Sequence, residues 1–130
     1  MKNKILTLVL LCIFLNPLLY SASSKPLQVL SLTKYSEKEK IDLLLKAIKE
    51  LKNVKFERNG SIHEAEDAVK LLKTKLNKVG VDNITAQEFI DKIASKSSTT
   101  GKPYYIVYPD GDKVPAGEFL KKKLSEIEAQ

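Results

Sequence analysis

Three glutamates, each three positions after a hydroxyl residue, constrain the fold of this chain more than any other feature. The pairs are Ser36 with Glu39, Ser61 with Glu64, and Thr85 with Glu88. At this spacing each side chain can accept a hydrogen bond from the backbone amide of the other residue, which satisfies donors that the start of a helix leaves free. Three such capping boxes predict three helix starts. Ile84 and Phe89 flank the third box at the spacing of a hydrophobic staple.

Apolar residues recur at helical spacing behind these boxes and once more near the C-terminus. The first two stripes contain Ile41, Leu44, Leu45, Ile48 and Leu51, and then Ala65, Ala68, Val69, Leu72, Leu76 and Val79. The other two contain Phe89, Ile90, Ile93 and Ala94, and then Phe119, Leu120, Leu124 and Ile127. Because residues at this spacing share one face of a helix, the stripes predict four helices around a common core. Gly80 supplies a stop for the second helix.

Two short segments break the helical pattern. Residues Val54–Arg58 alternate between apolar and polar, and Asn59 and Gly60 follow them as a hairpin turn signal. Residues Tyr104–Tyr108 favour a strand and end in a Pro-Asp-Gly-Asp turn, after which Val114 can start a return strand. The predicted fold is therefore α+β and mainly α, with about four helices and a small two- or three-stranded antiparallel sheet.

The first 23 residues have the layout of a secretory signal. Two lysines precede a run from Ile5 to Leu15 that is apolar except for Thr7, and small residues follow, with Ser21 and Ser23 ahead of the expected cut. An uncleaved membrane anchor is the alternative, but a spanning helix needs ~20 apolar residues. Pro17 would also break a helix that continued past the run. We expect the chain to contact a membrane only through this signal, before cleavage.

We accordingly expect a signal peptide over residues 1–23, a flexible leader over 24–35 and a single small globular domain over 36–130. The one cysteine, Cys12, lies inside the signal behind two bulky leucines, so lipidation is not expected. Its removal leaves a domain without disulfides or thiolate chemistry, which packing alone must stabilise. The formal net charge of +6 comes almost entirely from dispersed lysines. Nucleic-acid binding needs a concentrated basic face, and we therefore expect no nucleic-acid partner.

The segment from Arg58 to His63 is the first candidate site. A strand, a glycine turn and a helix start in succession would leave backbone amides at the positive end of a helix dipole, where Arg58 and His63 could hold an anion. The alternative is a plain turn and cap, with Arg58 paired to a nearby acid. His63, the only histidine, could also act as a base oriented by Asp67. With no second histidine and no cysteine, we expect no metal and no cofactor.

The segment from Ser95 to Gly101 is the second candidate, because it is rich in hydroxyl side chains. It is either a polar helix exit, in which hydroxyls cap carbonyls, or a loop that faces a ligand. For an enzyme, Ser97 or Ser98 would be the nucleophile, with His63 as general base and Asp67 behind it. The sequence has no Gly-x-Ser-x-Gly elbow to support this arrangement.

These segments resemble the YfeK-like family of small exported bacterial proteins, a domain of unknown function. The residues that carry the resemblance are Phe56–His63, Asp67 and Ala68, Phe89–Ser95 and Ser97–Tyr104, within a match from Ile41 to Val107. The resemblance implies a location in the bacterial envelope, with the periplasm as the first choice, and it implies no mechanism.

The resemblance also brings the two candidate segments together. We expect one shared site or, alternatively, one buried polar network, formed by Arg58, Asn59, His63, Ser97, Ser98 and Tyr104. The favoured function is a non-enzymatic binding module for an anionic ligand on a protein, peptide or cell-wall fragment. The first alternative is a small hydrolase or transferase that uses His63 as general base with Ser97 or Ser98. The second is an assembly role in which an exposed apolar helix face forms a dimer.

Overall fold

The computed structural model describes residues 34–130, so the predicted signal peptide and most of the predicted leader lie outside the described residues. The helices are α1 (Glu37–Lys49), α2 (Ala65–Val79), η1 (Val81–Asn83), α3 (Ala86–Glu88), η2 (Phe89–Ala94) and α4 (Ala116–Glu128). The strands are β1 (Lys55–Arg58), β2 (Ser61–His63), β3 (Tyr105–Val107) and β4 (Lys113–Pro115). Within residues 34–130 no helix is both long and apolar enough to span a bilayer. The predicted α+β, mainly α class is confirmed.

Two of the three predicted capping boxes are present. Ser36 caps α1 and Thr85 caps α3, and in both boxes the glutamate three residues later accepts a hydrogen bond from the backbone of the cap residue. The predicted staple partners Ile84 and Phe89 are both buried. Local side-chain chemistry therefore sets these two helix starts.

The predicted box at Ser61 is wrong, because Ser61 belongs to β2 and α2 begins four residues later. Asn59 and Gly60 have φ values of 50° and 81°, the positive pair that a two-residue hairpin turn requires. This turn pairs Arg58 with Ser61, so the backbone of Ser61 enters the sheet instead of a helix. Glu64 takes the N-cap position of α2 and makes no side-chain capping bond.

The sheet has four antiparallel strands in the order β2-β1-β3-β4, where two or three were predicted. Phe56 of β1 lies between His63 of β2 and Ile106 of β3. Because side chains alternate along a strand, Arg58 shares the face of Phe56. Phe56 and Ile106 are buried, so this face is turned toward the core.

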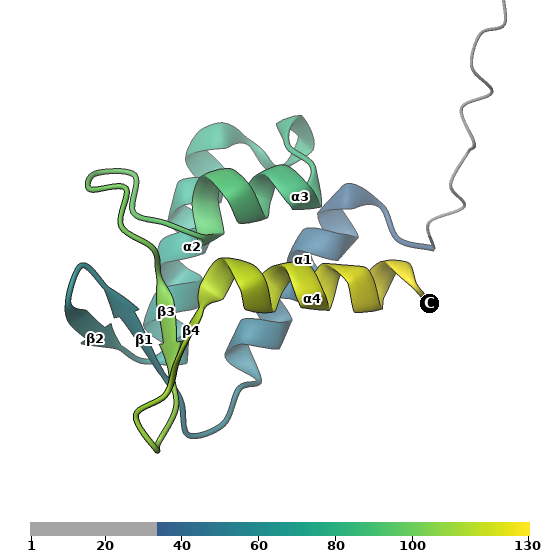
Figure 1. Cartoon of the computed structure of the whole chain (residues 1–130). Helices are drawn as coiled ribbons and strands as arrows, with labels where there is room; N and C mark the ends of the chain where they lie inside the picture. Colours follow the sequence, from purple (N-terminus) through teal and green to yellow (C-terminus); the bar gives the residue numbers. More distant parts are fainter. Residues whose placement is uncertain (1–33) are drawn as a thin grey trace, which may run out of the picture. The chain divides into compact units, whose positions relative to one another are not determined.

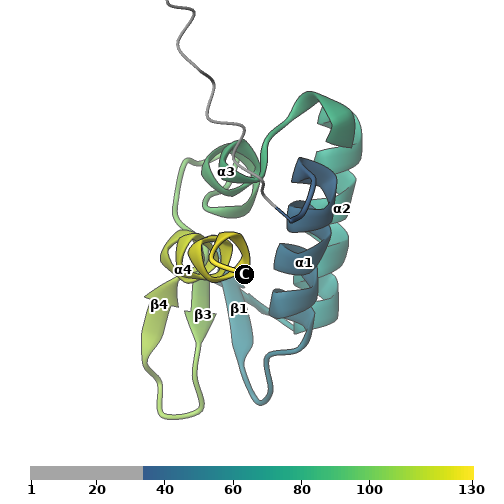
Figure 2. The ribbon, with the colours of Figure 1, turned by 90° about the vertical axis from the view of Figure 1, so that its right-hand side faces the viewer.

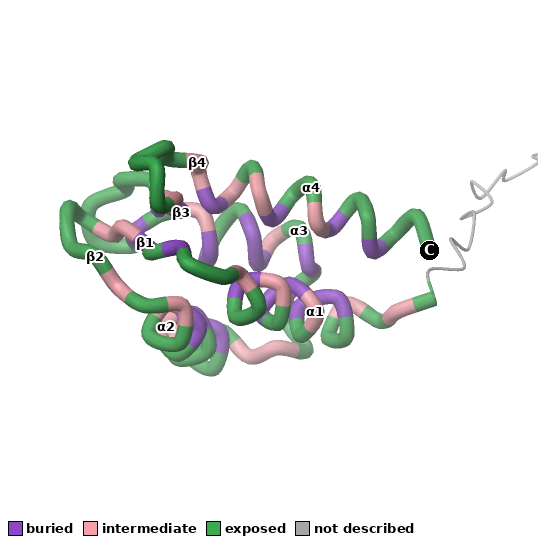
Figure 3. The backbone as a smooth tube through the Cα atoms, turned by 90° about the horizontal axis from the view of Figure 1, so that it is seen from below, coloured by how far each residue is buried: buried purple, intermediate pink, exposed green. Residues whose placement is uncertain are grey.

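The helices gather on that side of the sheet. Figure 2 shows α1 and α2 side by side, with α4 next to α1, and all three helices contact one another or η2. In Figure 3 the buried segments of α1, α2 and α4 are turned toward the interior. The residues with no exposed surface come from three helices and one strand: Ile41, Leu44, Phe89, Ile90, Ile106 and Leu120. The predicted stripes thus form one core, except that Val79 at the end of α2 is 48% exposed.

The predicted third helix is a single α-helical turn that continues as a π-helix, η2. Ser95 ends it by donating a hydrogen bond from Oγ to the carbonyl oxygen of Ile90, at 2.6 Å. The first turn of α4 packs closely on this end of η2. A Cβ atom on Gly117 would lie 2.6 Å from Ser95 Oγ, so this close approach requires glycine.

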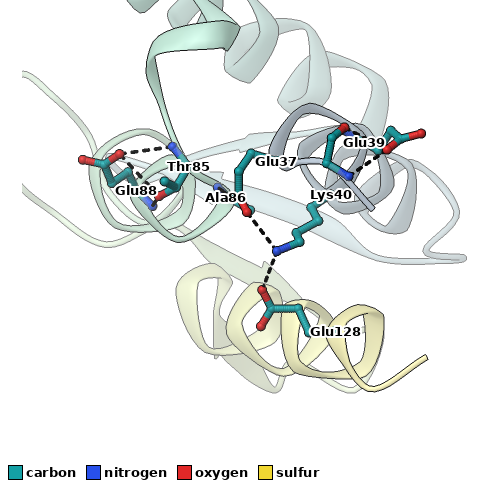
Figure 4. Close-up of polar contacts among 8 residues, drawn as sticks. Glu37, Glu39, Lys40, Thr85, Ala86, Glu88 and Glu128 are labelled. Atoms are coloured by element: carbon teal, nitrogen blue, oxygen red, sulfur yellow. Dashed lines mark hydrogen bonds and ion pairs between the residues drawn. The ribbon is translucent and has the colours of Figure 1, made fainter. Parts of the chain in front are cut away.

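A buried lysine connects the ends of α1, α3 and α4 (Figure 4). Lys40 is 3% exposed, and its Nζ atom lies 2.9 Å from Glu37 Oε1 and 2.8 Å from Glu128 Oε1. Glu37 also accepts a hydrogen bond of 2.6 Å from the backbone amide of Ala86, the first residue of α3. The hydrogen bonds that Lys40 donates to Glu128 and Glu37 raise its pKa above 10.5, against the opposing effect of burial.

Candidate functional site

A cavity of about 290 Å³ lies between α2 and the helix-facing side of the sheet. Its apolar lining comes from α1, β1, α2, η2 and α4: Ile48, Phe56, Ala68, Leu71, Leu72, Ala94 and Ala116. Its polar lining consists of Glu57, Arg58, His63, Asp67 and Tyr104. Figure 1 shows the hairpin of β1 and β2 and the helix that follows it, which supply most of these residues. The cavity is therefore an apolar recess with charged groups on its walls.

Arg58, the single arginine of the chain, has no partner in the described part of the protein. The Nε atom is buried without a hydrogen bond, and no ion pair among residues 34–130 includes the guanidinium group. The pairing of Arg58 with a nearby acid, the alternative considered for this segment, is thus not found there. A buried donor without an acceptor costs free energy, commonly about 1–3 kcal/mol. Arg58 is the strongest sign of a missing anionic partner.

Lys75 of α2 places a second positive charge near Arg58. Its Nζ atom donates hydrogen bonds to the carbonyl oxygen of Ile93 at 2.7 Å and to that of Lys96 at 3.3 Å. The same Lys75 Nζ atom lies 3.4 Å from the Tyr104 hydroxyl oxygen and 5.3 Å from the centre of the Tyr104 ring. Burial and, to a smaller extent, the positive charge of Arg58 lower the pKa of Lys75 below 10.5.

Sequence reasoning did not select Lys75, although one signal was available. Lys75 follows Leu71 by four positions and Leu72 by three, so it continues the apolar face of the helix. A lysine on such a face either extends to solvent or finds buried acceptors. Here it donates to carbonyl oxygens at the end of η2, which places its charge beside Tyr104 of the cavity lining, although Lys75 itself does not line the cavity.

His63 and Asp67 also line the cavity. His63 is the last residue of β2, and Asp67 lies in the first turn of α2, only four residues later. Among residues 34–130 no hydrogen bond joins these two side chains, and Asp67 forms no ion pair. Glu66 and Asp67 both lie in the first turn of α2, directly after the cap residue Glu64. This helix start is already negative, which disfavours an anion there, and Arg58 is the only lysine or arginine among the residues that line the cavity.

The remaining predicted residues form a polar network instead of a cavity wall. Asn59 donates from Nδ2 to Ser97 Oγ at 3.2 Å, and Thr100 donates from Oγ1 to Asn59 Oδ1 at 2.6 Å. Ser97 is 1% exposed and also accepts a hydrogen bond from the backbone amide of Thr100. Ser98 is exposed in the adjoining turn. This network connects the hairpin turn to the segment after η2.

The six predicted site residues therefore separate into two groups. Arg58, His63 and Tyr104 line the cavity, whereas Asn59 and Ser97 belong to the network, and Ser98 belongs to neither. Within the described residues no hydrogen bond joins Ser97 or Ser98 to His63, and no group of three histidine, cysteine or acidic side chains is placed to hold a metal ion. What the cavity offers chemically is an apolar volume with unpaired charges.

Comparison with known proteins returns a family and one relative. The model of a family of unknown function, DUF5329, matches residues 35–128. Uncharacterized protein YfeK of Salmonella typhimurium is 46% identical over 68 residues, which are 52% of this chain and 57% of that protein. The match thus spans only about half the length of each protein. No solved structure matches the chain.

Proposed function

Because the chain belongs to the DUF5329 family, whose function is unknown, we propose a role from the cavity: a non-enzymatic binding module that holds an anionic group against Arg58. The observation that carries this proposal is the buried Nε atom of Arg58, which has no hydrogen-bond partner among the described residues. A carboxylate or phosphate would supply that acceptor, and charge-assisted bonds to arginine are about twice as strong as neutral ones.

The apolar lining supports a ligand with an apolar body. Leucine, isoleucine and phenylalanine supply four of the seven apolar residues of the lining, and burial of apolar ligand surface against them contributes about 25 cal/mol per Å². Sites for small ligands typically combine such a lining with a few polar groups that fix orientation. Arg58 provides the charge, and the Tyr104 hydroxyl provides a neutral polar group.

A hydrolase or transferase that uses His63 is less well supported. A general base must come within hydrogen-bond reach of its nucleophile, directly or through one water. Ser97 Oγ is buried in the network with Asn59, and neither Ser97 nor Ser98 lines the cavity that contains His63. The binding module requires no such contact, and we therefore favour it.

We also propose that the protein is exported, with the periplasm as its location. The support is the charged start, apolar run and small residues of the first 23 positions, together with the envelope location that the resemblance to the YfeK-like family implies. Fractionation of cells that express the whole chain tests this directly. Recovery of a shortened protein in the periplasmic fraction is expected, and recovery of the full-length chain in the cytoplasm would contradict the proposal.

Titration with a matched pair of small probes tests the binding function. Hexanoate and hexanol share an apolar chain, but only hexanoate carries a charge for Arg58. We expect hexanoate to shift amide NMR signals of cavity residues at concentrations at least tenfold below those that hexanol needs. Arg58→Gln should abolish this preference, whereas the control Lys78→Gln, at an exposed position on α2, should keep it. Equal binding of both probes to the unaltered protein would overturn the proposal.

A further inference from the structure

Arg58 and Asp67 carry opposite charges and both line the cavity, and neither forms an ion pair among the described residues. They lie on different elements, β1 and α2. We infer that the ligand is a short peptide with free termini, whose carboxylate binds at Arg58 and whose amino group binds at Asp67. This inference rests on the proposed function, because it assumes that the anion binds Arg58.

The course of β1 and α2 separates the two charges. His63 pairs with Phe56 and leads through one residue into α2, so the start of α2 lies beside the Phe56 end of β1. Figure 3 shows this direct passage from β2 into α2. The other end of β1 carries Arg58, whose charge acts on Lys75 in the third turn of α2. The two elements therefore run side by side from the acidic end to the basic end.

The length of this path determines the size of the ligand. Lys75 lies outside the cavity lining but near Arg58, and Asp67 precedes it by eight residues on α2, about 12 Å along the helix axis. An extended chain spans about 3.3–3.6 Å per residue. A single amino acid cannot reach both ends, whereas a peptide of about three residues can, once the reach of the protein side chains is included.

The wall between the two ends is apolar. Leu71 lies one turn after Asp67 and one turn before Lys75, and it lines the cavity together with Phe56 and Tyr104. The central side chain of the peptide would therefore be apolar and would occupy the recess. A ligand with a second charge in its middle would lose solvation there without gaining a partner.

Asp67 is distinct from the other acids at the start of α2. Glu64 forms an ion pair with Lys55, and Glu66 lies outside the cavity lining. Asp67 could nevertheless serve only the helix dipole, since carboxylates are favourable in a first helical turn. Glu66→Gln therefore provides a matched control for Asp67→Asn: both remove one negative charge from the same helical turn, but only Asp67 lines the cavity.

The test uses calorimetric titration of the full chain with Ala-Leu-Ala as the free peptide, the C-terminal amide, the N-acetyl peptide and hexanoate. We expect the free peptide to bind best and each blocked form to bind at least fivefold more weakly. Asp67→Asn should weaken binding of the free peptide at least fivefold. It should leave the affinity for the N-acetyl peptide unchanged, because acetylation has already removed the amino-group charge that Asp67 is proposed to bind. Glu66→Gln should change neither affinity.

The possible failures separate the inference from the function on which it rests. If hexanoate binds as tightly as the peptide, or if Asp67→Asn weakens both peptides equally, the peptide inference is wrong and the anion site stands. If the amide binds as tightly as the free acid, the anion site is also wrong. Thermal denaturation of the two variants shows whether each is folded, and because both positions are exposed, we expect both to fold.

Discussion

Lys40 Nζ lies 2.8 Å from Glu128 Oε1, an ion pair that joins α1 to α4 between residues 88 positions apart. Glu37 holds the same ammonium group from the other side, at 2.9 Å. Lys40 is almost fully buried, whereas the two carboxylate side chains keep 45% and 43% of their exposure. Loss of both acids would therefore leave the buried ammonium group without a charged partner. Loss of the lysine would cost the carboxylates less, because water still solvates them.

Removal of both acids should expose this dependence. In the variant Glu37→Gln/Glu128→Gln the buried ammonium group of Lys40 keeps no acidic partner. We therefore expect the free energy of unfolding to fall by about 2 kcal/mol. This is less than the roughly 3–5 kcal/mol for fully buried pairs, because water screens the exposed carboxylates. Urea denaturation measures the change. Lys40→Met in the same background should recover most of the lost unfolding free energy. Glu50→Gln is the control, because it removes the acid of the exposed ion pair with Lys46. An unchanged midpoint in the double variant would contradict this account.

Acid should remove the contribution of Glu37. Burial opposes ionisation of this carboxyl, but hydrogen bonds from Lys40 and the Ala86 amide outweigh it and lower its pKa below 4.5. A lowered carboxyl pKa contributes stability that is complete above the unfolded value and is lost as the pH falls through the folded value. The difference in unfolding free energy between the unaltered protein and Glu37→Gln should thus be largest at pH 7 and shrink toward pH 3. A difference in unfolding free energy that grows as the pH falls would contradict the lowered pKa of Glu37 in the folded protein.

Gly117→Ala should destabilise the protein, although alanine is ordinarily better than glycine inside a helix by about 1 kcal/mol. The added Cβ would lie 2.6 Å from Ser95 Oγ and 3.1 Å from Ser95 Cβ, so α4 and the end of η2 must move apart. We expect a net loss of about 1–2 kcal/mol, within the usual range for overpacking. Thermal denaturation checks the sign, with Ser125→Ala at an exposed position of α4 as the control. Ser95→Gly in the same background removes the obstructing atoms and should restore part of the loss.

Arg58 and Lys75 can be tested without any ligand. Burial is the main cause of the lowered pKa of Lys75, and the charge of Arg58 is the second. Arg58→Gln should therefore raise the pKa of Lys75 toward its ordinary value without restoring it, since burial remains. Carbon-detected NMR of labelled lysine side chains follows this titration, and Lys78→Gln is the matched change on the same helix. If the Lys75 titration does not move, the two charges do not interact as the structure indicates.

The sequence predicted those parts of the fold that depend on local chemistry. The boxes at Ser36 and Thr85 predicted two helix starts correctly because their bonds lie within four residues. The same motif failed at Ser61, because pairing with Arg58 across the hairpin competes for the backbone there. The three-residue strand β2 is too short to show alternation and was predicted as a helix start, which explains the underestimated sheet.

The candidate site was predicted only in part for a similar reason. Arg58 and His63 stood out because they are the only arginine and the only histidine of the chain. Tyr104 was selected because it ends the segment Ser97–Tyr104, which carries the family resemblance. Lys75 and Lys40 did not stand out, because a lysine among many gives no local sign of its burial. Their roles follow from acceptors 18 and 88 residues away. Only the packed structure brings those acceptors to the lysines.

The network of Asn59, Ser97 and Thr100 provides the last prediction, which separates structure from catalysis. Asn59→Gly keeps the positive φ of the turn while it removes both side-chain hydrogen bonds to the loop. Ser97→Ala removes only the buried hydroxyl. We expect each variant to lose about 1–2 kcal/mol of unfolding free energy in urea and to bind hexanoate with unchanged affinity, because neither residue lines the cavity. The exposed neighbour gives the control, since Ser98→Ala should alter neither stability nor binding. If Ser97→Ala or Ser98→Ala instead weakened hexanoate binding tenfold at unchanged stability, the loop would belong to the binding site and the division into cavity and network would be wrong.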